Sequence, residues 1–255
     1  YLGTSIPRDI ERIKNDFSKR LRIDTDADIK KIKENFQANW KNLPPSIKEK
    51  QKEELAIIFT YNTNAIEGST ITLDETRGIV HDRIAPNKSI RDISETEAHS
   101  RILLEMLDKK ETIDIPLILK WHKEIFKETK KDIAGKFRTY LVTVGGHIPP
   151  DWRKVKSEMK KIIAFMKKHG REMSSVELAA RIHYRFEKLH PFGDGNGRVG
   201  RLFMNHLLWH DGYPMIIIEK KRRAAYYKAL RKKEDDFVKY FIRRYVKAHK
   251  NFVKR

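Results

Sequence analysis

Hydrophobic positions along this chain recur mainly at steps of three and four residues, which is the period of an α-helix. One such stripe, in the segment 174–189, consists of Ala179, Ile182, His183 and Phe186. Capping boxes, in which Ser or Thr precedes Glu by three residues, come before four periodic stretches, at Ser46–Glu49, Thr72–Glu75, Ser94–Glu97 and Ser174–Glu177. The pattern predicts helices at about 8–20, 26–41, 45–66, 73–82, 92–109, 114–127, 152–169, 174–189, 197–211, 221–232 and 235–252.

One segment departs from the helical period. Residues 137–150 read FRTYLVTVGGHIPP, in which β-forming residues surround a Gly-Gly pair and a Pro-Pro pair ends the run. Such a segment is typical of a short β-hairpin. The sequence shows no internal repeat and no low-complexity linker. The expected fold class is therefore all-α with a short β-hairpin flap at 136–150.

The amino-acid composition limits the classes of protein to which the chain could belong. The 255 residues are enough to bury a core, and they are 39% hydrophobic and 35% charged, as in a charged globular protein. There is no cysteine, which excludes disulfides and thiolate metal sites. No apolar run approaches the length of a membrane span, and the first residues do not resemble a signal peptide. We therefore expect a cytoplasmic protein without membrane contact.

The net charge is strongly positive. Lys and Arg total 55 against 35 acidic residues, a balance of +20. Such a field attracts polyanions, nucleic acid among them. The charge is spread along the chain, however, and no nucleic-acid-binding motif accompanies it. A lysine-rich solvated surface is the favoured interpretation, and a nucleic-acid partner stays an alternative without motif support.

The segment 190–201, HPFGDGNGRVGR, carries the clearest chemistry. Its glycines allow a tight turn that approaches a ligand closely, and the helix predicted after it begins with unpaired backbone N–H groups. Arg198 and Arg201 are three residues apart and project from the same side of the first turn. A turn of free amides with two guanidinium groups suits a polyphosphate.

Two residues of this segment add reactivity. The Asp194 carboxylate could bridge Mg²⁺ to phosphate oxygens, and His190 could accept a proton from an attacking hydroxyl. Together these groups indicate phosphoryl or nucleotidyl transfer. The plain alternative is a glycine-rich connector between two helices. The number of specified positions within twelve residues favours a site.

The segment resembles the signature of the Fic family, HPFx[DE]GNGRxxR, at every specified position. The resemblance implies a helical fold in which His190 is the catalytic base, Asp194 holds Mg²⁺ or Mn²⁺, and Arg201 reaches the γ-phosphate. The implied ATP-binding loop consists of Asp194, Gly195, Asn196, Gly197, Arg198, Val199, Gly200 and Arg201. The implied reaction moves AMP from ATP to a Ser, Thr or Tyr hydroxyl of a target protein or of the chain itself.

Two further segments resemble parts of the same family. The flap at 136–150 is expected to contact the nucleotide or the target through Val144, Gly145, Gly146 and His147. Tyr226 and Tyr227 are expected to flank adenine or its sugar. Core packing is the alternative interpretation for the two tyrosines, since aromatic side chains are core formers.

A second motif lies upstream. Residues 63–68, TNAIEG, fit the inhibitory pattern [ST]xxxE[GN] of Fic proteins. By this resemblance Glu67 pairs with Arg201, occupies the γ-phosphate position and inhibits the enzyme. In some relatives the same glutamate also supports removal of AMP. The alternative is an ordinary surface glutamate before a helix-ending glycine.

The expected organisation has three parts: an N-terminal helical region at 1–90 with the inhibitory helix at about 45–68, a Fic core at 91–232, and a basic C-terminal helix at 233–255. A homodimer that buries the inhibitory helix is compatible with it. Two rival functions stay open. One is a Fic-type transferase with another nucleotide donor, and the other is a basic nucleic-acid-associated regulator with a vestigial site.

Overall fold

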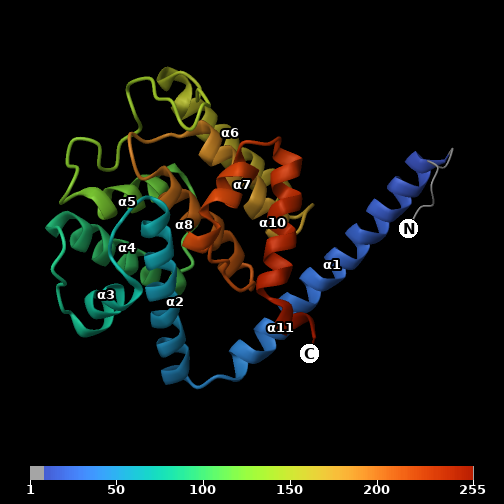
Figure 1. Cartoon of the computed structure of the whole chain (residues 1–255), viewed down its shortest axis with the longest axis horizontal. Helices are drawn as coiled ribbons and strands as arrows, with labels where there is room; N and C mark the ends of the chain where they lie inside the picture. Colours follow the sequence, from blue (N-terminus) through green and yellow to red (C-terminus); the bar gives the residue numbers. More distant parts are fainter. Residues whose placement is uncertain (1–8, 255) are drawn as a thin grey trace.

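The computed structural model describes residues 9–254, without the side chains of 13–24, and these residues are mostly helical (Figure 1). Residues 1–8, which belong to the expected N-terminal region, lie outside the described part. The helices are α1 (Ile10–Asn42), α2 (Pro45–Ile66), α3 (Leu73–Arg77), α4 (Ile90–Asp108), α5 (Ile115–Phe126), α6 (Val155–His169), α7 (Ser175–Leu189), α8 (Asn196–His210), α9 (Arg223–Leu230), α10 (Glu234–Ala248) and α11 (Lys250–Val253). Short turns of other helical types are η1 (Gly78–Asp82), η2 (Trp152–Lys154) and η3 (Lys220–Arg222). Within the described residues, no helix combines the length and the apolar character needed to cross a bilayer.

Most helix positions agree with the hydrophobic period. The expected break after residue 20 is wrong, because α1 continues through it as one helix. Residues 21–25 contain neither Gly nor Pro, so nothing in that stretch ends the helix. By contrast, α2 has the predicted bounds. It ends because Gly68 takes a φ of +100°, which favours glycine.

Two of the four predicted capping boxes mark real helix starts. Thr72 forms the full reciprocal box at the start of α3, and Ser174 accepts a backbone N–H at the start of α7. The prediction for Ser46 is wrong, because prolines begin α2. Ser94 lies inside α4, whose capping side chain is Ser89.

The core is arranged around α7 and α8, which lie side by side in the middle of the molecule (Figure 1). One apolar cluster joins α8 to α2, α4, α5 and α6, and it includes Phe59, Trp121, Phe126, Phe186 and Phe203. A second cluster joins the opposite side of α7 and α8 to α1 and α10, and it includes Ile32, Ala179, Met204, Phe237 and Phe241. The short loop between α7 and α8 is therefore held between two buried helices.

The flap segment is less regular than predicted. Val144 and His147 exchange two backbone hydrogen bonds, both 2.9 Å long, around Gly145 and Gly146, whose φ angles are +53° and +82°. The Gly-Gly turn is of the kind that closes a hairpin. Pairing stops after this one bridge, and no strand is present among residues 9–254. The expected β-hairpin is thus reduced to a turn in an extended loop.

Candidate active site

His190 stands at the point where α7 ends. Its φ of +50° is left-handed, which is uncommon for a residue other than glycine. Its backbone N–H donates to the carbonyl of Phe186 at 2.9 Å, and its own carbonyl accepts from Arg138 Nε at 2.8 Å. These bonds fix the backbone of His190 and offset the strain of its conformation.

The imidazole of His190 is half-buried. Its Nδ1 is buried and has no hydrogen-bond partner among the described residues. Burial, assisted by the nearby positive charge of Arg138, lowers the pKa of His190 below its ordinary value. The ring is therefore neutral under conditions in which it could accept a proton.

Hydrogen bonds from the Asn196 side chain fix the conformation of the loop after His190. Asn196 is 2% exposed, and its side chain donates to the Phe192 carbonyl at 2.9 Å and accepts from the Phe192 N–H at 2.8 Å. The amide side chain therefore shapes the turn and does not face open solvent. What Asn196 can offer a ligand is its backbone N–H at the first position of α8.

The N-terminus of α8 is open to an anion. Its N-cap residue, Gly195, makes no side-chain cap hydrogen bond, which leaves the first backbone N–H groups without that acceptor, and the helix dipole adds positive potential there. Glycine is required at Gly195 of this turn, because a Cβ there, where φ is +78°, would lie 2.3 Å from the ring of Phe126. A Cβ on Gly197 would lie 2.1 Å from Glu67 Oε1, the end of a flexible side chain.

Arg201 is almost completely buried, with 1% exposure, and residues of the segment 63–68 surround its guanidinium group. Its Nε donates to Thr63 Oγ1 at 2.6 Å, and its Nη2 donates to the Thr63 carbonyl at 3.2 Å and to Glu67 Oε1 at 2.6 Å. Burial opposes the charge, but Glu67 raises the pKa of Arg201. The Glu67–Arg201 contact implied by the resemblance is thus present in the structure.

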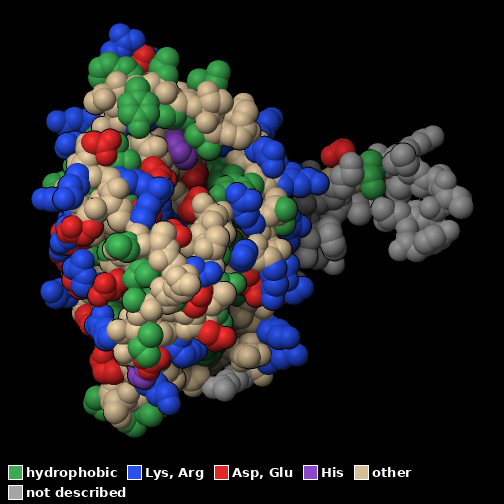
Figure 2. All heavy atoms as spheres, turned by 60° about the vertical axis from the view of Figure 1, so that its left-hand side comes forward, with side chains coloured by type: hydrophobic (Ala, Val, Ile, Leu, Met, Phe, Trp, Pro, Cys, Tyr) green, Lys and Arg blue, Asp and Glu red, His purple; other side chains and the backbone are tan. Residues whose placement is uncertain are grey.

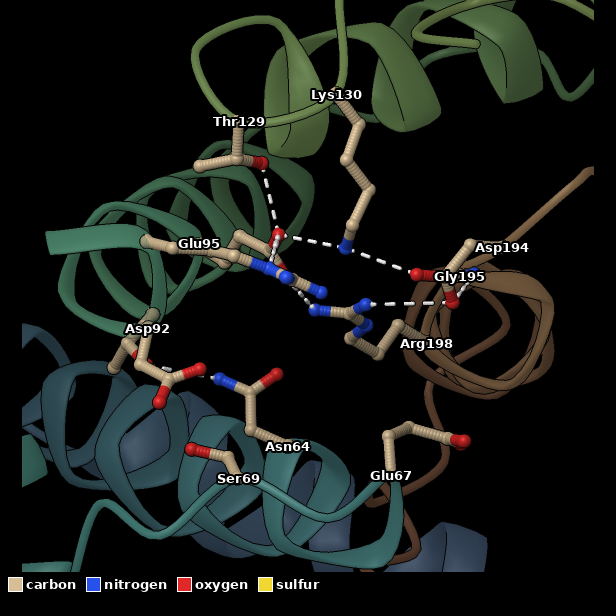
Figure 3. A network of polar contacts seen from close by, with 12 residues as sticks. Asn64, Glu67, Ser69, Asp92, Glu95, Thr129, Lys130, Asp194, Gly195 and Arg198 are labelled. Carbon is tan, nitrogen blue, oxygen red and sulfur yellow. Dashed lines mark hydrogen bonds and ion pairs between the residues drawn. The ribbon is translucent and has the colours of Figure 1, made fainter. Parts of the chain in front are cut away.

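Arg198 belongs to a second cluster of charges (Figure 3). It pairs with the buried carboxylate of Glu95 on α4, and its Nη2 lies 3.8 Å from Asp194 Oδ1. Lys130, which follows α5, lies 2.7 Å from Glu95 Oε1 and 2.9 Å from Asp194 Oδ2. Burial opposes ionisation of Asp194, but Lys130 and Arg198 together lower its pKa. Asp194 is therefore ionised at neutral pH.

A buried histidine fixes the backbone of Asp194. His122 Nδ1 accepts the Gly135 N–H at 2.9 Å, so the other ring nitrogen carries the proton. That nitrogen, Nε2, lies 3.0 Å from the Asp194 carbonyl and donates to it. Burial lowers the pKa of His122 to about 4, which keeps the ring in this neutral form. His122 is a positioning group that the sequence pattern did not reveal.

The carboxylate of Asp194 fits a metal that arrives with a nucleotide. Its side chain is 47% exposed beside the open helix terminus. No group of three or more His, Cys, Asp or Glu side chains could hold an ion within the described part of the chain. Mg²⁺ is commonly held by one or two carboxylates together with phosphate oxygens and water. Asp194 therefore suits a shared ion better than a resident one.

Comparison with known proteins agrees with this geometry. Residues 112–208 match the sequence model of the Fic/DOC family. Proteins named protein adenylyltransferase Fic are 35% identical in Drosophila ananassae, over 75% of this chain and 40% of the relative, and 35% identical in Nematostella vectensis, over 72% and 44%. The chain belongs to the Fic/DOC family. It spans about two fifths of the length of these curated relatives.

Solved structures confirm the Fic fold. Fic-1 (aa134–508) from C. elegans superimposes with a TM-score of 0.78 at 26% identity, over 96% of this chain and 77% of that one. A Fic-domain-containing signaling protein from Bacteroides thetaiotaomicron superimposes with a TM-score of 0.74 at 24% identity, over 89% and 97%. The expected all-helical fold class is confirmed.

The side chains of several residues expected in the Fic site face the interior of the protein. Tyr226 is 1% exposed and its hydroxyl lies 2.7 Å from His183 Nε2, so it is a core residue and not the wall of an open pocket. Tyr227 beside it is half-buried and stays a candidate for nucleotide contact. The side chain of Val199 packs into the core. Gly200 faces Glu187, where a Cβ would lie 2.8 Å from Oε1.

The flap candidates lie at the surface. Gly145 and Gly146 are exposed, and nothing lies within 4 Å of a Cβ built on either residue. Val144 and His147 are half-buried, and His147 Nε2 lies 3.1 Å from the Lys188 carbonyl. The turn of the flap is therefore free to meet a ligand or a target, as proposed below.

Arg138 connects the flap to the Fic loop. This residue is 3% exposed, and besides His190 its guanidinium donates to the carbonyls of Tyr140 at 2.9 Å and Pro150 at 2.5 Å. Both ends of the flap are thereby tied to the backbone of His190. Arg138, near the start of the flap, gave no signal in the sequence, because its hydrogen-bond partners are all carbonyl groups.

Glu187, one turn before His190, is a second buried carboxyl group near Arg201. Its Oε1 is buried without a hydrogen-bond partner among the described residues. Burial raises the pKa of Glu187 from 4.5 to about 7, although the charge of Arg201 opposes the rise. The sequence pattern placed no function on this residue.

Glu187→Gln should stabilise the protein at pH 8 and have little effect at pH 5. A carboxyl with a raised folded-state pKa loses stability as pH rises from its unfolded pKa to its folded pKa, here from 4.5 to about 7. The gain at pH 8 should reach about 3 kcal/mol at most, from ~1.4 kcal/mol per pKa unit. Urea unfolding at both pH values measures it, with the exposed Glu128→Gln as the control. Destabilisation at pH 8 would show instead that Arg201 holds Glu187 ionised.

Proposed function

We propose that this Fic protein transfers AMP from ATP to Ser, Thr or Tyr hydroxyls of proteins, its own chain included. One observation carries the proposal. A neutral histidine, an open helix N-terminus, an ionised aspartate and two arginines converge on the single loop between α7 and α8. The names of the curated relatives support the same activity.

The proposed reaction uses the residues as follows. The imidazole of His190 removes the proton of the target hydroxyl. The hydroxyl oxygen forms a bond to the α-phosphorus of ATP, and the bond from that phosphorus to the bridging oxygen of the β-phosphate breaks. Pyrophosphate leaves with the electron pair. The N–H groups at the start of α8 stabilise the negative charge of the phosphates during the transfer.

Asp194 is the residue that would hold a divalent ion, Mg²⁺ or Mn²⁺, together with the phosphates. Such an ion neutralises phosphate charge and orients the leaving group when it is bound. Arg201 is the proposed partner of the γ-phosphate, and the backbone of Gly195, Asn196 and Gly197 that of the inner phosphates. Val144, Gly145, Gly146 and His147 are proposed to cover the nucleotide or to bind the target segment.

Glu67 is proposed to inhibit this reaction. It binds the same guanidinium group that the γ-phosphate would need, and its Oε1 lies against Gly197 at the start of α8. A triphosphate in its productive position would meet a carboxylate there. Displacement of Glu67 would free Arg201 and open the position.

The nucleic-acid alternative gains no support. Figure 2 shows acidic side chains interspersed among the basic ones over the face that comes forward, so this face carries no continuous basic field. The Fic loop contains the proposed base His190, the carboxylate of Asp194 and two arginines. A vestigial site would be expected to have lost some of these groups. The net charge of +20 fits a solvated exterior rich in lysine.

Glu67→Gly should increase labelling of the protein with AMP by roughly tenfold or more, since couplings between sites are commonly worth 5- to 150-fold. Intact-mass spectrometry after incubation with Mg-ATP measures it as an added AMP.

His190→Ala in the Glu67→Gly protein should lower the rate of AMP labelling by about 10²–10⁴-fold, the usual contribution of a general base.

The matched control for His190→Ala is His81→Ala, which removes an exposed histidine paired with Glu53. Undiminished labelling of the Glu67→Gly/His190→Ala protein would disprove the catalytic assignment. A mass increment other than that of AMP would disprove the choice of donor.

The pH dependence of the rate provides a separate test. A histidine with a lowered pKa stays neutral as pH falls through 6.5, and its function as a base is lost only below that value. The Glu67→Gly protein should therefore keep more than half of its plateau rate at pH 6.5. Initial rates at saturating Mg-ATP between pH 5 and 8 measure this. A midpoint at or above 6.5 would contradict the assigned environment of His190.

A further inference from the structure

Both oxygens of the Asp194 carboxylate already have partners. Oδ1 accepts the N–H of Gly195 at 2.5 Å and lies 3.8 Å from Arg198. Oδ2 lies 2.9 Å from the ammonium group of Lys130. A divalent ion needs one of these oxygens, and an ammonium group within contact distance of the same oxygen would repel it. Binding of a metal at Oδ2 therefore requires Lys130 to move.

The side chain of Lys130 is packed against the site and is not a freely solvated surface lysine. Its side chain is 15% exposed, and its ammonium group lies 4.6 Å from the centroid of the Phe126 ring. Its backbone N–H donates to the carbonyl of Phe126 at 2.8 Å. Lys127, one turn earlier, is 40% exposed and pairs only with Glu124 at the surface. These packing contacts place the ammonium group of Lys130, and not that of Lys127, beside the Asp194 carboxylate.

Glu95 gives Lys130 an anchor that does not depend on Asp194. Its Oε1 lies 2.7 Å from Lys130 Nζ and accepts the hydroxyl of Thr129 at 2.8 Å, while its Oε2 binds Arg198. Figure 3 shows Glu95 reaching from α4 into the space between these groups, with Lys130 bridging from it to Asp194. An ammonium group released by Asp194 would therefore stay beside the start of α8, where the phosphates are proposed to bind.

We propose that Lys130 is a displaceable counter-ion of Asp194. It neutralises Oδ2 until a divalent ion arrives with the nucleotide, and then turns its ammonium group to the polyphosphate oxygens while Glu95 retains it. This inference rests on the proposed binding of ATP at the Fic loop. It assigns Lys130 a positioning and phosphate-binding role that the signature sequence does not include.

Removal of Lys130 should weaken nucleotide binding by different amounts in the absence and in the presence of a bound metal ion. In the absence of metal, a triphosphate near Asp194 meets a carboxylate whose charge Lys130, at 2.9 Å, compensates more closely than Arg198, at 3.8 Å. Lys130→Gln removes that compensation and the attraction to phosphate together. With metal bound, the ion neutralises Asp194 directly, and the loss of Lys130 costs less. The substitution should therefore act mainly on metal-free binding.

Calorimetric titration with α,β-methylene ATP, which cannot transfer AMP, tests this in the Glu67→Gly protein. In EDTA, Lys130→Gln should weaken binding by roughly tenfold or more, as expected for one charge lost at contact distance. In saturating Mg²⁺ the loss should shrink to about threefold or less, because the ion compensates Asp194. Lys130→Arg, which keeps the charge, should preserve metal-free binding, and Lys127→Gln should change neither value.

Equal weakening with and without Mg²⁺, or unchanged binding in EDTA, would overturn the inference. Absence of nucleotide binding in the Glu67→Gly protein itself would overturn the proposed function, so the two failures are distinguishable.

Discussion

The structure of the site depends on the hydrogen-bond acceptors around the buried guanidinium group of Arg201. Arg201 is 1% exposed, and a charge in that position is tolerated only when it is paired and hydrogen-bonded. Thr63 and Glu67 supply its partners from α2, the helix that packs against α4 and α8. The bonds that pair the Nε and Nη2 groups of Arg201 thus attach the C-terminal end of α2 to the Fic loop.

This requirement also explains how the contact can be released. Loss of one partner of a buried ion pair commonly costs about 3–5 kcal/mol, unless another anion replaces it. A γ-phosphate is such an anion, and the helix terminus beside Arg201 would bind the rest of the polyphosphate. Glu67 is 30% exposed and ends its helix, so it is the partner free to leave. Arg201 and Thr63, by contrast, are buried.

Much of the site was predictable because its residues are close in the sequence. The loop 190–201 contains the histidine, the carboxylate, the glycines and both arginines, and a motif can specify them together. Glu67 was found through a second motif, although 134 residues separate it from Arg201. The helices followed from the apolar period, and the flap was overestimated because β-forming residues alone do not provide a pairing partner.

The remaining site residues could not be predicted from one sequence. Lys130 and Glu95 are two charged residues among 90, and only the packing of α4 and α5 against α8 brings them to Asp194. Arg138 binds carbonyl groups, which leave no pattern in the sequence. Glu187 has the spacing of an ordinary helix residue, and only its buried, unpartnered oxygen distinguishes it.

The most direct test is a crystal structure of the Glu67→Gly protein with Mg²⁺ and α,β-methylene ATP. The account predicts a triphosphate along the start of α8, with its α-phosphorus facing the imidazole of His190 and its γ-phosphate on Arg201. A loop that stays closed to the anion, or a nucleotide bound elsewhere on the protein, would contradict it.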